Sequence, residues 1–399
     1  MTNDMPVHVH ILGDSDVRIW QLSGRQRLER SLARLDNVAS TASPQALPGE
    51  ATLIVLRGDR LYDGRILSAL ADGQQPLMLV DSDGQPCALR GSASRASEFL
   101  ALLTDETRQW TGDPCFTPDQ LVTDPRTSLK SIAVPRVEAI RSSNRKRLEK
   151  ELFTGSYKGV TDLVTKWLWP LPARWATHLC LHLGVNPNAV TLMSLILAIL
   201  ATMAFWQGAY LTGLAAAWLM TFLDTLDGKL ARVSIESSQF GDRLDHGLDL
   251  LHPPFWYLAW GLGLSGGWAL TPDFGVVIAI LFLTYIGGRL CEGAFSWLAG
   301  FSLFVWRPFD SINRLVTARR NPNLLLLTGS LVAARPDIGL WLVAMWHLVS
   351  TAVLLARLGW AGWQRLRKAE LVSWLEQVDP KAHRDRLAVR LFTQTPARP

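Results

Sequence analysis

Apolar positions are distributed unevenly along this chain of 399 residues. After residue 185 they form long runs with few charges, which are typical of helices that cross a bilayer. Six such runs predict six spans: Ala189–Trp206, Leu211–Leu230, Leu244–Leu264, Phe274–Leu298, Leu324–Ala334 and Ile338–Leu358. The fifth run is shorter than the ~20 residues that a spanning helix needs. We therefore expect it to be tilted or partly buried against its neighbours.

The first 130 residues show a different pattern, in which short apolar segments alternate with amphipathic ones. This pattern predicts strands at Val7–Leu12, Ala51–Leu56 and Pro76–Val80, and helices at Gly24–Leu35 and Leu61–Ala71. A β-α-β-α-β order indicates an α/β layer. The predicted fold class is a mainly α polytopic membrane protein with a small N-terminal α/β domain in the cytoplasm.

A basic and aromatic segment separates these two parts. Residues 135–150 carry six Lys or Arg against two acids, which fits a solvated linker or a patch attracted to anionic lipid head groups. Three tryptophans and two prolines between Lys158 and Gly184 suit the membrane interface. The predicted divisions are 1–134 (α/β domain), 135–185 (linker and juxtamembrane helix), 186–358 (membrane domain) and 359–399 (amphipathic helix and tail).

The composition argues against several classes of protein. The four cysteines show neither C-x-x-C spacing nor a partnering His pattern, which argues against a disulfide framework or a zinc site. The first residues lack a basic-then-apolar signal peptide, so the α/β part is expected to stay in the cytoplasm. The net charge of +5 suits anionic lipid better than nucleic acid, because no basic-aromatic face accompanies it.

The distribution of cations predicts the topology. With the N-terminus inside, the inward connections hold Lys229, Arg232, Arg243, Arg307, Arg314, Arg319, Arg320, Arg365, Arg367 and Lys368, whereas the outward ones hold only Arg335. That asymmetry follows the positive-inside rule. It predicts a multi-pass inner-membrane protein with both termini in the cytoplasm.

Four carboxylates lie where the second and third predicted spans meet. Asp224 and Asp227 are i,i+3 neighbours, and Asp245 and Asp249 are i,i+4 neighbours, so on helices each pair would share a face. Carboxylates at membrane depth are costly and point to function. Four converging acids would repel one another unless a cation neutralised them, and hard oxygen ligands suit Mg²⁺ or Mn²⁺. The spacing predicts a metal-assisted phosphoryl-transfer site.

The same stretch reads D-x2-D-G-x2-A-R-x8-G-x3-D-x3-D, which resembles the signature of the CDP-alcohol phosphotransferase family. Every specified position is filled, by Asp224, Asp227, Gly228, Ala231, Arg232, Gly241, Asp245 and Asp249. Eight such positions match by chance at roughly one start in 10¹⁰ at average residue usage. The stretch from Pro187 to Thr191 also resembles the family's P-N-x-x-T start.

The resemblance implies the family's six-helix fold and its reaction. A substituted phosphate would pass from a CDP-alcohol, CDP-diacylglycerol above all, to an acceptor hydroxyl, with release of CMP, in phospholipid biosynthesis. It also implies a homodimer.

The resemblance also assigns roles within the signature. Asp224, Asp227 and Asp245 would hold the divalent metal, and Asp249, grouped with these ligands, would be the general base. Gly228, Ala231, Arg232 and Gly241 would receive the nucleotide; Arg232 could instead be a helix-end cation that reaches the interface.

Four further arginines are candidates for binding a phosphorylated acceptor: Arg289, Arg314, Arg319 and Arg320. A guanidinium presents a planar fork suited to phosphate. For Arg289 the alternative is a buried ion pair with Glu292, three residues further along. For the other three arginines the alternative is that they serve only the positive-inside topology. If the four converge, a phosphorylated polyol such as inositol phosphate or glycerol phosphate is the expected acceptor. Transfer from a soluble CDP-polyol such as CDP-inositol is the alternative.

The N-terminal part resembles the opening of a sugar-nucleotidyltransferase-like domain. Gly13 to Arg18 falls where a nucleotide loop would lie, and Asp59 where a metal aspartate would lie. The loop has a single glycine, no Pro-Lys-Pro stretch follows it, and the chain is short for a full domain. We therefore expect an inactive domain with a stabilising or regulatory role. A transporter would show inverted repeats, which are not found, and a non-catalytic scaffold would be expected to lose signature positions.

Overall fold

The structure is a computed structural model that describes residues 6–105, 114–122, 135–156, 159–236, 239–378, 382–383 and 385–393, without the side chains of 239–240, 242–246 and 248. The chain divides into two compact units. The first contains the described residues up to Ser156 together with Val233–Glu236, and the second contains the remainder. Residues 137–155, part of the predicted linker, thus belong to the first unit.

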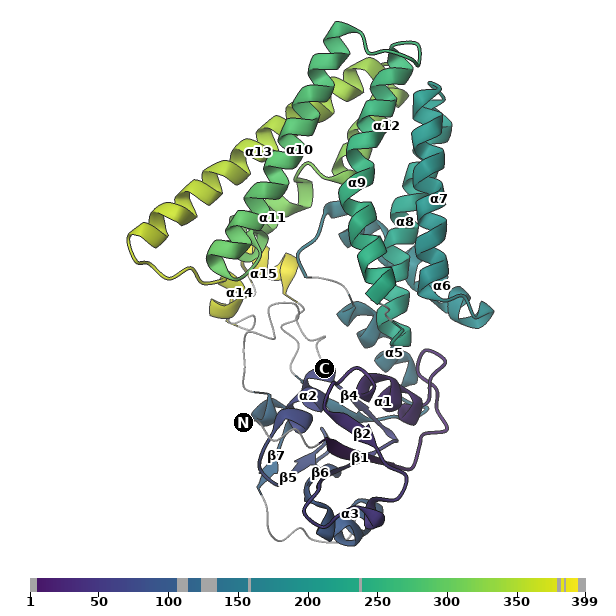
Figure 1. The fold of residues 1–399 in the computed structure, drawn as a ribbon, viewed down its shortest axis with the longest axis vertical. Coiled ribbons are helices and arrows are strands. Elements are labelled where there is room, and N and C mark those ends of the chain that lie inside the picture. The colour runs from purple at the N-terminus through teal and green to yellow at the C-terminus, as the bar shows by residue number, and fades with distance from the viewer. Residues whose placement is uncertain are drawn as a thin grey trace. The chain divides into compact units, whose positions relative to one another are not determined.

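A mixed sheet forms the centre of the first unit (Figure 1). Its six strands lie in the order β2-β1-β3-β6-β5-β7. Their bounds are β1 Val7–Leu12, β2 Val38–Ser40, β3 Thr52–Arg57, β5 Leu77–Val80, β6 Pro86–Ser92 and β7 Cys115–Phe116. β1 is parallel to β2 and β3, β6 is antiparallel to β3 and β5, and β7 is parallel to β5. A separate antiparallel pair joins β4 (Arg60–Tyr62) to β8 (Val137–Ala139).

Helices cover both faces of this sheet. Successive strand residues point to opposite faces, and in β3 Ile54 and Leu56 pack with the cluster that includes α1 (Gly24–Leu32) and α2 (Gly64–Asp72). Leu53 and Val55 pack with the cluster that includes α3 (Ala96–Thr104). Two further helices are α4 (Pro118–Leu121) and α5 (Arg145–Gly155). Ser23 and Gln26 form a capping box that starts α1, and Asp63 caps α2.

The predicted α/β class of this unit is confirmed, and the three predicted strands and two predicted helices all have counterparts. The main shift is at Leu61–Ala71, where the chain first forms β4 and the helix begins only at Gly64. Tyr62 pairs with Val137, so contact with a distant segment keeps the first residues of the predicted helix extended.

The second unit is helical. Its longer helices are α6 Pro170–Leu183, α7 Pro187–Trp206, α8 Tyr210–Ser234, α9 Gln239–Leu264, α10 Pro272–Ala299, α11 Pro308–Val316, α12 Arg320–Val332 and α13 Pro336–Leu366. Short elements are the π-helix η4 (Val164–Leu168), the 3₁₀-helix η5 (Leu303–Val305), α14 (Trp374–Gln377) and α15 (Leu387–Phe392). Helices α7–α10, α12 and α13 share one apolar core that includes the fully buried Phe205, Trp260 and Leu281.

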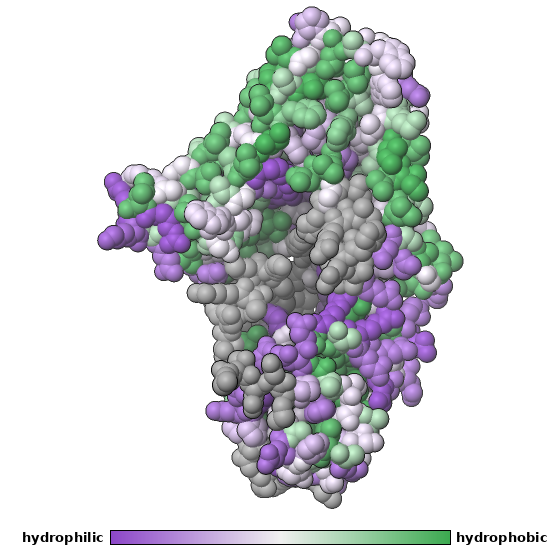
Figure 2. All heavy atoms as spheres, viewed as in Figure 1, coloured by the Kyte–Doolittle hydropathy of each residue, from purple (hydrophilic) through white to green (hydrophobic). Residues whose placement is uncertain are grey.

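Within the described residues, three helices are long and apolar enough to cross a membrane: α7, α10 and α13, of 20, 28 and 31 residues. The prediction of a helical membrane region is confirmed, whereas the count of six spans stays a prediction. The face drawn in Figure 2 is strongly apolar over α10 and α13. α12 has only 13 residues, about 20 Å at 1.5 Å per residue.

Helix α6 has an apolar stripe at four-residue spacing. Leu171, Trp175, Leu179 and Leu183 lie one turn apart, and their side chains are 43–81% exposed. Gly184, in the left-handed region with φ +69°, ends the helix. Asn186 then caps α7 by accepting from the Ala189 N–H at 2.8 Å. An exposed apolar stripe of this kind suits a helix lying in the membrane interface.

Candidate active site

Helix α8 carries the first two aspartates of the signature. Asp224 and Asp227 are one turn apart, and Asp227 is 4% exposed. The Thr191 hydroxyl on α7 donates to the Asp227 carboxylate at 2.6 Å. A buried charge needs such a partner. Thr191, the last residue of the stretch from Pro187, is therefore a neighbour of the site that the sequence analysis did not include among the site residues.

Arg320 joins the two acidic helices. Its Nη1 donates to an Asp224 oxygen at 3.0 Å and to an Asp249 oxygen at 2.7 Å, and its Nη2 also pairs with Asp224. Asp249 lies on α9, so carboxylates from two helices converge on a single nitrogen. The side chains of Asp224 and Arg320 are 11% and 14% exposed, but that of Asp249 is 49% exposed. Asp249 can therefore meet a substrate.

The remaining signature positions lie on the same two helices. A Cβ built on Gly228 would lie 3.0 Å from the Arg232 guanidinium. The Arg232 side chain therefore occupies the space beside this glycine. Ala231 and Gly241 are half-buried. The backbone of Asp245 lies one turn before Asp249 in α9, and its side chain is outside the described residues.

The donor set suits a divalent cation in its chemistry. Carboxylate oxygens are the ligands that Mg²⁺ and Mn²⁺ prefer, and those of Asp224 and Asp249 already approach one positive group. Among the described side chains, no group of three or more Asp, Glu, His or Cys is arranged to hold a metal. The described part of the site thus supplies a pair of converging carboxylates, with Arg320 between them.

The other three candidate arginines gather at a second point. Arg289 lies 3.7 Å from a Glu292 oxygen, and Arg319 pairs with the same oxygen. The guanidiniums of Arg314 and Arg319 each lie 5.4 Å from the centre of the Phe304 ring. We call Arg289, Arg314 and Arg319 the arginine cluster. The structure brings these three arginines together, whereas Arg320 pairs with Asp224 and Asp249 instead.

The arginine cluster has unused donors. The buried Nη1 of Arg314 and Nε of Arg319 have no hydrogen-bond partner among the described residues. A buried unpaired donor is costly, so each of these two groups can donate to a ligand or to water. Burial disfavours the charged form of Asp162, but the Arg314 charge and hydrogen bonds from Thr165 and Asn321 outweigh it and hold the pKa of Asp162 below its ordinary value.

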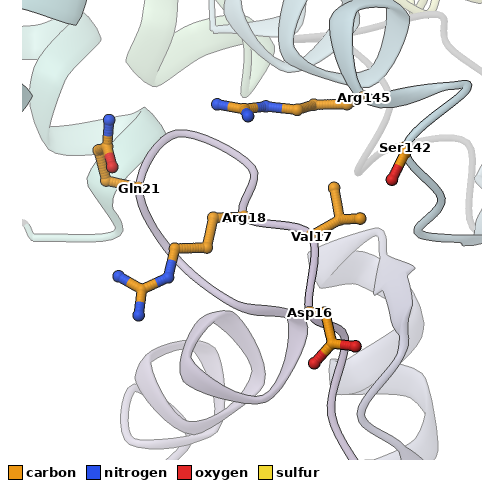
Figure 3. A pocket seen from close by; sticks show the side chains of 6 residues that line it. All are labelled: Asp16, Val17, Arg18, Gln21, Ser142 and Arg145. Carbon is orange, nitrogen blue, oxygen red and sulfur yellow. The ribbon is translucent and has the colours of Figure 1, made fainter.

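The first unit has a separate pocket of about 460 Å³, lined by Asp16, Val17, Arg18, Gln21, Ser142 and Arg145. Figure 3 shows Arg145, at the start of α5, extending over the loop that carries Arg18 and Gln21. The predicted nucleotide loop thus borders a pocket, whereas Asp59 pairs with Arg57 and Arg60 at 2.9 and 2.6 Å.

The loop beside this pocket is held in an unusual shape. Trp20 and Gln21 have positive φ angles of 51° and 65°, and Ile19 pairs with Leu22 across them. Such a turn is strained for residues other than glycine and asparagine. Glu149 of α5 secures it, since its carboxylate accepts from the Trp20 N–H at 3.2 Å and its carbonyl from the indole at 3.0 Å.

Comparison with known proteins finds a family match for part of the helical unit. Residues 184–305 match the sequence profile of the CDP-alcohol phosphatidyltransferase family. An archaetidylinositol phosphate synthase of Pyrococcus horikoshii is 35% identical over 111 residues, or 27% of this chain and 52% of the relative. Cholinephosphotransferase 1 of Bos taurus is 24% identical over 163 residues, or 38% of this chain and 37% of the relative. The chain thus spans about half the length of the first relative and over a third of the second.

Among solved structures, the Mycobacterium tuberculosis phosphatidylinositol phosphate synthase in complex with manganese and citrate aligns with a TM-score of 0.33 and 17% identity. The alignment covers 46% of this chain and 87% of that structure. None of these matches supports the nucleotidyltransferase resemblance of the first unit, which stays a prediction.

Proposed function

We propose that this chain, whose residues 184–305 belong to the CDP-alcohol phosphatidyltransferase family, transfers a substituted phosphate group from a CDP-alcohol to an acceptor hydroxyl and releases CMP. The observation that carries the proposal is the convergence of Asp224 and Asp249 on one cationic group within the complete signature. Carboxylates that converge on positive charge can hold a divalent cation, and such a cation assists a reaction that breaks a pyrophosphate bond.

Asp249 is proposed as the general base. Its carboxylate is half-exposed and pairs with Arg320, so a carboxylate oxygen can accept the proton of an acceptor hydroxyl as that oxygen attacks phosphorus. The bond from that phosphorus to CMP breaks, and CMP leaves with the electron pair. Arg232, across Gly228, is proposed to meet a phosphate of the nucleotide.

Asp224, Asp227, Asp245 and Asp249 are proposed to hold Mg²⁺ or Mn²⁺. When bound, such a cation neutralises the charge that develops on the non-bridging oxygens. The Thr191 hydroxyl orients the Asp227 carboxylate, and Arg320 holds Asp224 and Asp249 near each other.

The donor is proposed to be CDP-diacylglycerol, and the acceptor a phosphorylated polyol such as inositol phosphate or glycerol phosphate. The three arginines of the cluster face Glu292 and Asp162, which leaves excess positive charge and unpaired donors. These groups would hold an acceptor phosphate. The archaeal relative is named as a synthase of archaetidylinositol phosphate, a product with an inositol phosphate head group. A soluble CDP-polyol such as CDP-inositol remains the alternative donor.

The same proposal includes six spans, a homodimer and both termini in the cytoplasm, where nucleotides are available. Support for six spans comes from the helices α7, α8, α9, α10, α12 and α13 that share one core. Support for the orientation comes from the cations near the ends of α8 and α11.

The testing experiment is release of labelled CMP from CDP-diacylglycerol in membranes that contain the full chain, with Mg²⁺ or Mn²⁺. Inositol phosphate, glycerol phosphate, serine and inositol are offered in turn. Release with one acceptor, lost on chelation of the metal, identifies reaction and substrate. Failure with all four leads to the same assay with CDP-inositol, and failure there as well would contradict the proposal.

Replacing Arg314 with Gln is expected to raise the KM for a phosphorylated acceptor by about 10- to 100-fold, because a charge-assisted hydrogen bond to phosphate is lost. The KM for the CDP-alcohol should stay the same. Arg307, exposed on the same segment, provides the matched control Arg307→Gln. Equal KM values for the phosphorylated acceptor in wild type and Arg314→Gln would remove the arginine cluster from acceptor binding.

The first unit is proposed to have a stabilising or regulatory role without catalysis. Arg18 lines its pocket, and Arg18→Gln in the full chain is expected to leave the rate of CMP release within about twofold of wild type, since surface changes away from a site are usually mild. The initial rate and the binding of labelled CTP are the measurements. A rate loss above tenfold, or CTP binding that Arg18→Gln abolishes, would show that this unit handles nucleotide.

A further inference from the structure

Helix α9 contains two consecutive prolines just after the proposed base. Pro253 and Pro254 lie inside the helix and are buried. In an α-helix the N–H of each residue bonds to the carbonyl four residues earlier. Proline has no N–H, so the carbonyls of Asp249 and Leu250 lose their helical donors. The carbonyls left without donors are those of the proposed base and of the residue after it.

A hydroxyl from the neighbouring helix takes the place of both missing donors. The Tyr285 hydroxyl on α10 lies 2.9 Å from the Leu250 carbonyl oxygen and 3.3 Å from that of Asp249. Tyr285 is 8% exposed, so its ring is fixed by packing. One O–H shared between two carbonyls fixes the turn of α9 that bears Asp249 relative to α10.

Tyr285 also connects this turn to the arginine cluster. Arg289 is one helical turn further along α10, and its Nη2 lies 3.5 Å from the Tyr285 oxygen. The Arg289 guanidinium is also 5.3 Å from the centre of the Tyr285 ring. The tyrosine thus lies between the residue proposed to take the acceptor's proton and a residue proposed to bind the acceptor's phosphate.

We infer that Tyr285 is a positioning residue for Asp249: its hydroxyl replaces the helical donors that Pro253 and Pro254 lack and so fixes the direction of the Asp249 carboxylate. The inference rests on the proposed function for the role of Asp249. A helical N–H at residues 253 and 254 would satisfy the carbonyls from within α9 alone. The proline pair instead makes the position of this turn depend on α10, the helix that carries Arg289.

The first test is Tyr285→Phe in the full chain, which keeps the ring and removes the hydroxyl. We expect the kcat for CMP release to fall about 10- to 100-fold, because a small misplacement of a reacting group has effects of this size. The KM for the CDP-alcohol should change less than about twofold. Tyr210→Phe is the matched control, since the Tyr210 hydroxyl also donates to a carbonyl of α9, that of Trp260, at 3.4 Å. The control should keep the wild-type kcat.

The decisive variant restores the missing donors. In a Pro253→Ala, Pro254→Ala background, helical N–H groups can bond to the carbonyls of Asp249 and Leu250, so adding Tyr285→Phe should lower kcat by less than about threefold. A loss of kcat as large as in the wild-type background would overturn the inference, because the hydroxyl would then act elsewhere.

A stability measurement separates this inference from the proposed function. Tyr285→Phe should lower the melting temperature of the purified chain by about 2–4 °C in the wild-type background and by less in the proline-free background. If no donor yields CMP, the proposed function fails while this comparison still tests the hydrogen bonds. Equal shifts in both backgrounds would overturn the inference, whether or not the chain is active.

Discussion

Replacing Asp249 with Asn is expected to lower the rate of CMP release by about 10²- to 10⁴-fold, the usual contribution of general-base catalysis. Asparagine keeps the size of the side chain but cannot take the proton of the acceptor hydroxyl. The half-exposed carboxylate of Asp249 is the one in this site that a substrate can reach most easily among those described. Turnover is measured as labelled CMP release at saturating donor and acceptor.

A measurement of donor binding by Asp249→Asn distinguishes loss of the general base from loss of the binding site. The variant should still bind labelled CDP-diacylglycerol, because the other signature aspartates remain. Asp273→Asn is the matched control, since Asp273 lies in the exposed first turn of α10 and outside the site. Unchanged turnover in Asp249→Asn would remove Asp249 from the role of base, and loss of donor binding would show that its part in holding the metal and donor accounts for the lost turnover.

Replacing Arg320 with Gln is expected to lower the melting temperature of the metal-free chain by on the order of 10 °C. Breaking a buried ion pair by removing one partner costs about 3–5 kcal/mol, and for a unit of about 150–250 residues, such as the helical one, each kcal/mol corresponds to about 2–4 °C. The Asp224 pair accounts for most of this effect. The contact with Asp249 contributes little, because that carboxylate is 49% exposed.

Added Mn²⁺ should stabilise Arg320→Gln more than wild type, because in the variant two carboxylates lack their counter-charge. Thermal unfolding in detergent, with chelator and then with Mn²⁺, measures both effects. The matched control is Arg335→Gln, which breaks an exposed pair with Asp337. Equal Mn²⁺-induced shifts in Arg320→Gln and wild type would show that the cation and Arg320 do not act on the same carboxylates.

The signature in the sequence was sufficient to place the aspartates on helices, but it left four arginines equivalent. The structure separates Arg319 from Arg320 at the start of α12. Arg319 is the extended residue before the helix, with φ −134° and ψ 176°, whereas Arg320 begins the helix. Two neighbours on either side of a helix boundary point in different directions, so one reaches Glu292 and the other Asp224. The positions of helix boundaries are the least certain part of a sequence-based prediction.

The role of Tyr285 could be predicted only in part. Pro253 and Pro254 in an apolar run indicate that two carbonyls need an outside donor, and this much can be read from the sequence. The donor itself lies on another helix, which periodicity does not specify. In the first unit, β8 was missed for a similar reason, because Val137–Ala139 is a short strand whose partner β4 is distant in the chain.

The short helix α12 has a consequence for the depth of its charged end. At 13 residues it is about 20 Å long, whereas the hydrocarbon layer is about 30 Å thick. If its apolar end at Val332 reaches one boundary of that layer, the end at Arg320 lies about 10 Å inside the other. Charged groups at that depth face the interior of a helix bundle or a water-filled cavity and pair with one another, as Arg320 does with Asp224 and Asp249. Under the proposed function, the short helix would bring this charged end to a depth where a water-soluble reactant entering from one side could meet a reactant with acyl chains that arrives through the lipid.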